Sequence, residues 1–233
     1  MSRNSGRFIA IAVVLVLAGV YTILRDRQGP DTGVPEAVAV APAPDPASAP
    51  APAPEPAVTP EAADLGLSIQ IAGEANGTVV IDLLEDVAPG HAARIAALAK
   101  SGAYDGVVFH RVIDGFMAQT GDVTFGKSGG EGFDMRRAGM GGSDLPDLKA
   151  EFSDIPFERG VVGMARSQSP DSANSQFFIM FDAGPFLNGQ YTVVGKVTEG
   201  MEVVDAIKRG DARANGAVLG EPDRMVAVTV TGE

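Results

Sequence analysis

The sequence predicts a mainly β fold, in which eight short antiparallel strands form a closed barrel accompanied by two helices. Three observations support this fold class. The chain contains many short runs of β-branched and aromatic residues, the spacings between them are short, and only two segments carry a helical apolar stripe. Short connections favour antiparallel pairing, and numerous short strands favour closure into a barrel. The 233 residues, 45% of them hydrophobic, suffice for one sizeable core and additional segments.

The first 28 residues predict a membrane anchor or an export signal. Residues 8–24 form a run of 17 uncharged, mostly apolar residues. A helix of this length spans about 26 Å, close to the roughly 30 Å hydrocarbon core of a bilayer. The run does not end in a small-x-small cleavage site, so we expect a retained anchor, with a cleaved signal peptide as the alternative. Arg3, Arg7 and the α-amino group precede the run, and Arg25 and Arg27 follow it with Asp26 between them. This slight bias favours a cytoplasmic N-terminus and an external position for the rest of the chain.

Residues 29–64 predict a disordered linker. The segment contains 10 prolines and 11 alanines in 36 residues, and much of it alternates between the two. Proline fixes φ and lacks an amide hydrogen, so neither helix nor sheet propagates. We expect a polyproline-like spacer that could reach on the order of 110 Å. A ligand for an SH3-type domain is the disfavoured alternative, because the segment contains no arginine to orient it.

The globular domain is expected to span residues 65–233. Asn76-Gly77 is typical of a hairpin turn, Pro89 suits the first turn of a helix, and Gly102 is expected to end that helix. The expected strands are 67–71, 78–84, 107–112, 116–120, 160–165, 176–181, 191–197 and 225–231, and the expected helices are 91–100 and 201–209.

Residues 124–150 are rich in glycine and lack a periodic pattern, so we expect a long surface segment. Residues 121–128 match the G-x-x-x-x-G-K-S pattern of a phosphate-binding loop. That loop requires a following helix whose amides cradle the phosphate, and the Gly129-Gly130 pair cannot start a stable helix. We therefore do not expect nucleotide binding.

Composition disfavours several other classes of function. The net charge is −12, with 4 basic and 7 acidic residues in 1–64 and 14 and 23 in 65–233. Both parts are acidic, which argues against nucleic acid as a partner. The absence of cysteine removes disulfides, thiolate chemistry and cysteine-ligated zinc. His91 and His110, the two histidines, lie far apart and form no metal-ligand spacing, so no metal or cofactor is expected.

Two neighbouring segments carry the polar residues of interest. On a strand, residues two apart share a face, so Met117 and Gln119 point the same way. Arg111 lies in an otherwise apolar strand, and a guanidinium is almost never buried unpaired, so it must face a partner, solvent or a ligand. In the strand 176–181, one face is expected to carry Gln176, Phe178 and Met180, and the other Phe177, Ile179 and Phe181.

These segments resemble the active-site signature of the cyclophilins, a family of peptidyl-prolyl cis–trans isomerases. The resemblance covers roughly residues 65–233, and its pieces occur in the family's order at similar spacings. They are the stretches 109–113 (FHRVI), 115–119 (GFMAQ), 121–122 (GD), 163–165 (GMA), 175–179 (SQFFI), 186–187 (FL) and 193–197 (VVGKV). The resemblance implies a closed barrel with a helix over each end. Together with the N-terminal segment, it suggests a bacterial, exported kind of enzyme.

The resemblance also implies roles for individual residues. Arg111 would be the catalytic donor to the prolyl nitrogen, and the carbonyl of Gln119 would hold it while the Gln119 amide donates to the peptide. Phe116, Met117, Phe178 and Leu187 would bind the proline ring. The substrate main chain would be bound by Gln176 and the backbone of Ala165 and Arg166, and Phe186 and Tyr191 complete the substrate-binding set.

The sequence departs from the best-known eukaryotic pattern at three positions. Phe186 replaces Trp, Tyr191 replaces His, and Arg166 replaces Asn. Phenylalanine cannot supply the N–H of an indole. We therefore expect weak binding of cyclosporin, and we interpret His110, which faces away from Arg111 on the strand, as structural.

The expected partners are proline-containing polypeptides and, through the N-terminal helix, the inner membrane, with the domain on the periplasmic side. Cleavage of the signal would instead leave the protein soluble in the periplasm. We expect a monomer in either case. A non-catalytic module or holdase that binds proline-containing peptides is the alternative function. A barrel around a small apolar ligand is a weaker one, because apolar residues on both strand faces suggest a packed interior. The Ala-Pro bonds of the linker could themselves be substrates.

Overall fold

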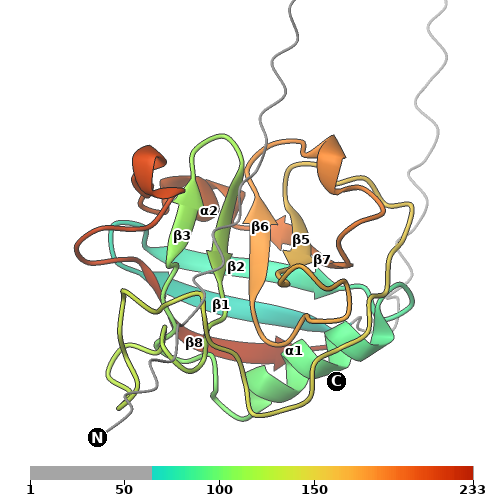
Figure 1. Ribbon diagram of the computed structural model, residues 1–233, viewed down its shortest axis with the longest axis horizontal. Coiled ribbons are helices and arrows are strands. Elements are labelled where there is room, and N and C mark those ends of the chain that lie inside the picture. The colour runs from blue at the N-terminus through green and yellow to red at the C-terminus, as the bar shows by residue number, and fades with distance from the viewer. Residues whose placement is uncertain (1–64, 233) are drawn as a thin grey trace, which may run out of the picture. The chain divides into compact units, whose positions relative to one another are not determined.

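The computed structural model describes residues 65–232, which form an eight-stranded antiparallel half-barrel with two α-helices (Figure 1). The strands are β1 (Gly66–Ala72), β2 (Gly77–Leu83), β3 (Arg111–Ile113), β4 (Met117–Thr120), β5 (Val161–Met164), β6 (Phe177–Met180), β7 (Val193–Glu199) and β8 (Arg224–Thr231). The helices are α1 (Pro89–Lys100) and α2 (Met201–Ala206), with 3-10 turns at Pro185–Leu187 and Ala212–Ala214.

The strands pair in the order β3-β4-β6-β5-β7-β2-β1-β8, and each pairing is antiparallel, as the sequence predicted. Backbone hydrogen bonds also link residues 106–109 to residues 223–225 at the start of β8. Within residues 65–232, β3 and β8 themselves share no ladder. The structure therefore shows a half-barrel, and full closure stays a prediction.

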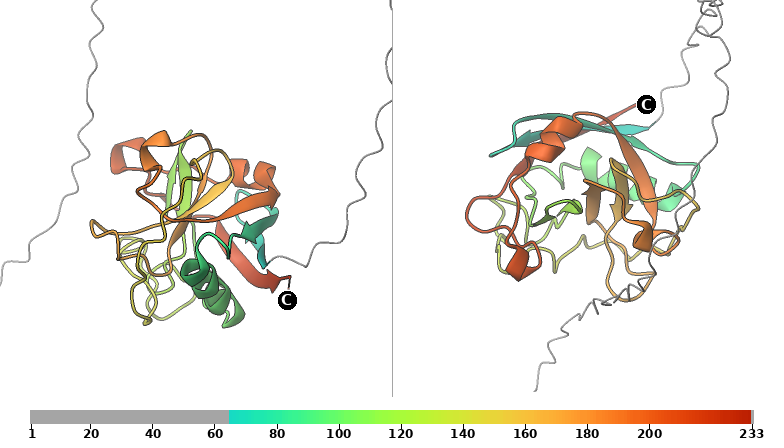
Figure 2. Two further views of the ribbon diagram at one scale, coloured as in Figure 1. Left: turned by 90° about the vertical axis from the view of Figure 1, so that its right-hand side faces the viewer. Right: turned by 90° about the horizontal axis from the view of Figure 1, so that it is seen from above.

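Each helix packs against strands of the sheet. Helix α1 contacts β8, and Figure 1 and the left view of Figure 2 show the two elements side by side. Helix α2 contacts β2. The inner faces of β1 and β2 supply much of the main core, together with Ile95 and Leu98 of α1. Alternate residues of β1, among them Leu67 and Ile69, are fully buried, which is the period of two expected for a half-exposed strand.

Strand β6 alternates between two apolar clusters, and this alternation confirms the predicted faces. Phe177, Ile179 and Phe181 belong to the main core. Phe178 and Met180 point to the other side, where they form a second cluster. This outer cluster also contains Met117, Phe157, Val161, Leu187 and Val193.

Among the predicted elements, the strand 107–112 and the helix 201–209 are shortened most in the structure. The expected strand 107–112 begins only at Arg111, because Val107 and Val108 form isolated bridges to different segments, at Lys127 and Arg224. The expected helix 201–209 ends at Ala206. The following backbone is extended, and the amide of Lys208 donates to Asp223 Oδ2 at 2.7 Å. The long segment 124–150 contains no helix or strand, so the phosphate-loop pattern lacks the helix that it needs.

The expected anchor (1–28) and linker (29–64) lie outside the described residues. Within 65–232, no helix is both long enough and apolar enough to cross a membrane. The same residues contain no cluster of three or more histidine, cysteine or acidic side chains suited to a metal ion.

Candidate active site

Arg111 lies at the start of β3, directly opposite Gln119 on β4. Its Nη1 donates to Gln119 Oε1 at 3.1 Å and lies 4.0 Å from the sulfur of Met117. Partial burial lowers the pKa of the guanidinium, which nevertheless stays protonated at neutral pH. Removal of water strengthens any hydrogen bond that this cation makes. Arg111 therefore has a partner, as expected, and remains a strong donor.

Asn215 holds the opposite edge of the same guanidinium. Arg111 Nε donates to the Asn215 carbonyl at 3.0 Å, and Nη2 donates to Asn215 Oδ1 at 3.1 Å. Arginine carries five N–H donors. The oxygens of Gln119 and Asn215 orient the plane of the group and leave donor capacity for a ligand. The sequence pattern does not reveal Asn215, because Asn-Gly is an ordinary turn pattern and its partner is 104 residues away.

Gln119 continues the polar chain toward Gln176. Its Nε2 donates to Gln176 Oε1 at 3.0 Å. An amide nitrogen carries two N–H donors, so the donation to the peptide that the resemblance implies stays a prediction. Gln176 Nε2 in turn donates to the carbonyls of Gly139 and Gly141, at 3.1 and 2.7 Å. The guanidinium is thus connected through two amide side chains to the segment 139–142.

A buried carboxylate fixes that segment. Asp122 is fully buried, and its Oδ2 accepts hydrogen bonds from the amides of Gly139 and Gly141 at 2.7 and 2.9 Å. His110 is buried next to Gly139, and neither of its ring nitrogens has a hydrogen-bond partner among the described residues. Burial lowers the pKa of His110 to about 4, so the ring is neutral at pH 7. This environment agrees with the structural role expected for His110.

The outer apolar cluster lies beside Arg111. Met117, Phe178 and Leu187 are buried in it, and Phe116 and Tyr191 are partly buried at its edge. Phe178 packs edge-to-face with Tyr191, with ring centroids 6.0 Å apart. Further aromatic contacts join Phe116 to Phe186 at 5.3 Å and Phe178 to Phe157 at 5.8 Å. Phe186 is 64% exposed, so an aromatic surface faces solvent beside Phe116.

Phe157 is a second residue that the sequence analysis missed. It lies in an irregular segment without a periodic pattern, yet it stacks on Phe178 and is 1% exposed. Phe157 therefore supports the outer cluster through its contact with the Phe178 ring.

A cavity of about 570 Å³ adjoins the amide chain. Its walls bring together Gln119, Gln176, Ala165 and Arg166, all of which the sequence analysis selected. The remaining lining is mostly small or polar: Gly139, Met140, Gly141, Gly142, Ser143, Asp147, Ser167, Ser172 and Asn174. The cavity can therefore accept an extended polar chain.

Arg166 joins this cavity to the outer cluster. Its guanidinium lies 4.3 Å from the centroid of the Tyr191 ring, and its Nε and Nη2 donate to the carbonyl of Gln190 at 3.2 and 2.9 Å. The amide of Ala165 donates to the Gln176 carbonyl at 2.9 Å. Arg166 thus fixes the aromatic wall formed by Tyr191.

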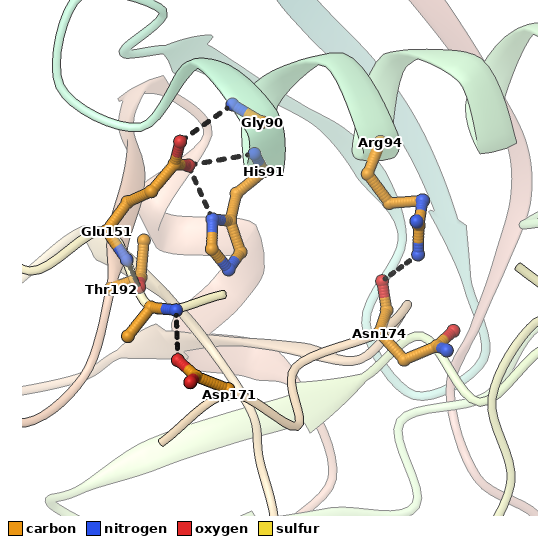
Figure 3. A network of polar contacts seen from close by, with 8 residues as sticks. Gly90, His91, Arg94, Glu151, Asp171, Asn174 and Thr192 are labelled. Carbon is orange, nitrogen blue, oxygen red and sulfur yellow. Dashed lines mark hydrogen bonds and ion pairs between the residues drawn. The ribbon is translucent and has the colours of Figure 1, made fainter. Parts of the chain in front are cut away.

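Helix α1 anchors the loops around the cavity (Figure 3). Glu151 accepts hydrogen bonds from the amides of Gly90 and His91, both at 3.1 Å, and from His91 Nδ1 at 2.6 Å. Its own amide donates to Thr192 Oγ1, next to Tyr191. Burial alone would raise the pKa of Glu151, but the hydrogen bonds from His91 and the two amides outweigh it and lower that pKa. Glu151 thereby supplies the cap that α1 lacks locally, since its N-cap residue makes no side-chain bond.

The structure connects the whole predicted set of site residues through contacts. Hydrogen bonds link Arg111, Gln119 and Gln176, and the cavity adds Ala165 and Arg166. The outer cluster and its ring contacts hold the others: Phe116, Met117, Phe178, Phe186, Leu187 and Tyr191. A charged donor, an apolar surface and a polar cavity therefore adjoin one another.

Comparison with known proteins places this geometry in a family. Residues 67–230 match the family model described as "Cyclophilin type peptidyl-prolyl cis-trans isomerase/CLD". A Brucella suis protein named "Probable peptidyl-prolyl cis-trans isomerase" is 61% identical over 158 residues, which are 68% of this chain and 80% of that protein. Peptidyl-prolyl cis-trans isomerase B of Bacillus subtilis is 35% identical over 147 residues, 63% of this chain and 94% of that protein.

Solved structures agree. A cyclophilin-type isomerase of Cryptosporidium parvum, crystallised in the presence of the dipeptide Ala-Pro, has a TM-score of 0.59 and 26% identity, covering 71% of this chain and 98% of that one. Cyclophilin AquaCyp293 of Hirschia baltica has a TM-score of 0.57 and 25% identity, covering 72% and 74%. This chain belongs to the cyclophilin-type peptidyl-prolyl cis-trans isomerase family.

Proposed function

We propose that the protein accelerates rotation about X–Pro bonds in exported polypeptides, with Arg111 as the hydrogen-bond donor to the prolyl nitrogen. The observation that carries the proposal is the partly buried guanidinium, held at both edges by Gln119 and Asn215 beside the outer apolar cluster. A cation fixed in this way can donate into a bound peptide without first reorganising.

Acceleration of this rotation needs only an interaction that is stronger with the twisted X–Pro bond than with the planar one. An X–Pro bond resists rotation because the nitrogen shares its lone pair with the carbonyl, which gives a barrier of about 18–20 kcal/mol. As the bond twists, the lone pair localises on nitrogen and becomes a better acceptor. A donor at that position therefore binds the twisted state more tightly than the planar one. Each tenfold increase in rate requires the barrier to fall by about 1.4 kcal/mol. A charge-assisted hydrogen bond shielded from water can supply several such increments.

The other site residues would bind and orient the peptide. Met117, Phe178 and Leu187 offer apolar surface to the proline ring, and the amide chain of Gln119 and Gln176 lies where the adjoining main chain would run. The Cryptosporidium parvum relative was crystallised with Ala-Pro, which supports a small residue before proline as a suitable substrate here.

A coupled isomerase assay tests this function. The full chain, Arg111→Ala and a matched control, Arg136→Ala, are compared on an Ala-Pro peptide. Arg136 has a side chain that is 92% exposed and is paired with Asp134, so its removal should leave the rate unchanged. We expect Arg111→Ala to lower kcat/KM by about 10²- to 10³-fold. If the wild type binds the peptide but is no faster than buffer, the protein is instead a binding module or holdase.

We also propose that residues 1–28 anchor the protein in the inner membrane, with the domain on the periplasmic side and acting as a monomer. The support is the uncharged run of residues 8–24 with Arg3 and Arg7 before it. Fractionation of cells that express the full chain should place it in the membrane pellet. Recovery of a shortened chain in the soluble periplasmic fraction would favour signal cleavage.

A further inference from the structure

We propose that Asn215 is a positioning residue for Arg111, an inference that rests on the proposed function. The motif stretches that carry the resemblance to the cyclophilins do not include this residue. The geometry points to it, because Asn215 accepts from two of the three guanidinium nitrogens, through its carbonyl at 3.0 Å and its Oδ1 at 3.1 Å.

The two hydrogen bonds to Asn215 fix the orientation of the Arg111 guanidinium as well as its position. A guanidinium is planar, and two parallel acceptors along one edge fix the plane as well as the distance. Gln119 then holds the Nη1 corner on the far edge, at 3.1 Å. Without the Asn215 edge, the long side chain of Arg111 could pivot about its single remaining oxygen partner. In most complexes with bound peptide, the Arg111 guanidinium would then no longer point toward the prolyl nitrogen.

The backbone of Asn215 is held in an uncommon conformation that enables this contact. Its φ is +54°, and no other non-glycine residue within 65–232 has a positive φ. Asparagine tolerates this left-handed region better than most residues, but the conformation still costs free energy. Such conformations persist where the surrounding structure enforces them, and they gather at functional sites.

The turn around Asn215 holds its left-handed conformation through contacts before and after this residue. Asp211 accepts from the amides of Arg213 and Gly216, at 2.8 and 2.9 Å, which closes the turn over Asn215. The Gly216 carbonyl accepts from the amide of Val112 at 2.8 Å, so the turn is bonded to the residue that follows Arg111. A Cβ on Gly216 would lie 2.5 Å from Ile113, which shows how closely the turn packs on β3. These contacts therefore fix the position of the two Asn215 acceptors relative to β3, the strand that carries Arg111.

The neutral charge of Asn215 fits this role. Among the described residues, no carboxylate forms an ion pair with Arg111, and the neighbouring Asp114 is paired with Arg209 at 2.9 Å. An amide orients the cation without neutralising it. A carboxylate at position 215 would compete with the prolyl nitrogen for the same positive charge.

Two substitutions in the full chain separate orientation from charge. Asn215→Gly keeps the left-handed backbone and the carbonyl but removes Oδ1. We expect kcat to fall about tenfold with little change in KM, because the interaction strengthens in the twisted state. Asn215→Asp keeps an acceptor but adds a charge, and we expect a fall at least as large. Asn76→Gly is the matched control, since Asn76-Gly77 is also an Asn-Gly turn but lies in the β1–β2 hairpin, and it should leave kcat unchanged.

A double-substitution cycle decides whether the effect passes through Arg111. In the Arg111→Ala background, Asn215→Gly should have no further effect on the rate, because the group that it orients is absent. Wild-type kcat in Asn215→Gly, or an equal tenfold loss in the Arg111→Ala background, overturns the inference while leaving the proposed function intact. Full activity of Arg111→Ala would overturn both. Thermal unfolding of each variant, with an unchanged midpoint expected for Asn215→Gly, verifies that the fold is retained.

Discussion

Arg111 and Gln119 face each other as direct partners in the β3–β4 ladder, with Arg111 Nη1 3.1 Å from Gln119 Oε1. The contact is therefore set by strand register. A slip of one residue would turn the side chain of Gln119 to the opposite face and bring Ala118 or Thr120 opposite Arg111. The same ladder places Met117 on the face of Gln119, so the cation and the apolar cluster are positioned together.

Gln119→Glu should lower kcat/KM by about tenfold. The new carboxylate would pair with Arg111 and draw its charge away from the substrate, and it could not donate to Gln176 Oε1 as the amide does. Gln70→Glu on the exposed side of β1 is the matched control and should be neutral. Steady-state kinetics on an Ala-Pro peptide measure the effect. A Gln119→Glu enzyme with wild-type kcat/KM would contradict the role given to this amide.

Gly163→Ala should impair substrate binding and stability together. A Cβ at this position of β5 would lie 2.4 Å from the ring of Phe178 and 2.6 Å from that of Phe157, so the stacked pair must shift. We expect a loss of about 1–3 kcal/mol in the free energy of unfolding, and an increase in KM because Phe178 belongs to the outer cluster.

Val162→Ala separates these two effects. Val162 is the neighbouring residue of β5, but its side chain lies in the main core. Its truncation should cost a similar free energy of unfolding without raising KM. If Gly163→Ala and Val162→Ala change KM equally, the outer cluster is not the site that binds the proline ring.

His110 should make stability depend on pH from about 6.5 down to about 4, a range that begins above that of the carboxylates. Burial lowers its pKa to about 4, from an ordinary value of 6.5. Because the folded state favours the neutral ring, the stabilisation is fully present above pH 6.5 and is lost as the pH falls toward the folded-state pKa, by up to about 3 kcal/mol. His110→Gln should flatten the curve of unfolding free energy between these pH values. An NMR titration midpoint near the ordinary value for the His110 ring would contradict this account.

Cyclosporin should bind weakly to this protein. Phe186 is exposed beside Phe116 and has no N–H to donate. Phe186→Trp supplies that donor and should tighten binding by about tenfold, measured by calorimetric titration. Phe152→Trp, at another exposed phenylalanine, is the matched control and should have no effect. Tight inhibition of the wild type by cyclosporin would show that the indole donor is dispensable here.

The regular part of the site followed from the sequence because strands have a period of two. That period correctly separated Phe178 and Met180 from Phe177 and Ile179, and it placed Met117 and Gln119 on one face. The antiparallel pairing of short strands was also correct. The expected strand at 107–112 failed in part, because the strand pattern of these residues does not reveal that their backbone partners are divided between separate segments.

The irregular part of the site could not be predicted in this way. Asn215, Phe157 and the Asp122 carboxylate act through contacts between segments that are distant in the sequence, and no local period marks them. The donation from Gln119 to Gln176 depended likewise on side-chain orientation. Motif spacing therefore located the hairpin that carries Arg111 and Gln119, whereas the residues that support it emerged only from tertiary structure.

The central claim, that Arg111 promotes rotation about the X–Pro bond, is tested most directly by the rate of interconversion on the enzyme. Exchange NMR of a labelled Ala-Pro peptide, saturated with the full chain in mild detergent, measures the cis–trans rate of the bound peptide separately from its affinity. The account predicts that Arg111→Ala slows bound interconversion by about 10²-fold or more while the peptide still binds, and that Arg111→Lys recovers only part of the rate. Bound interconversion as fast in Arg111→Ala as in the wild type would contradict it.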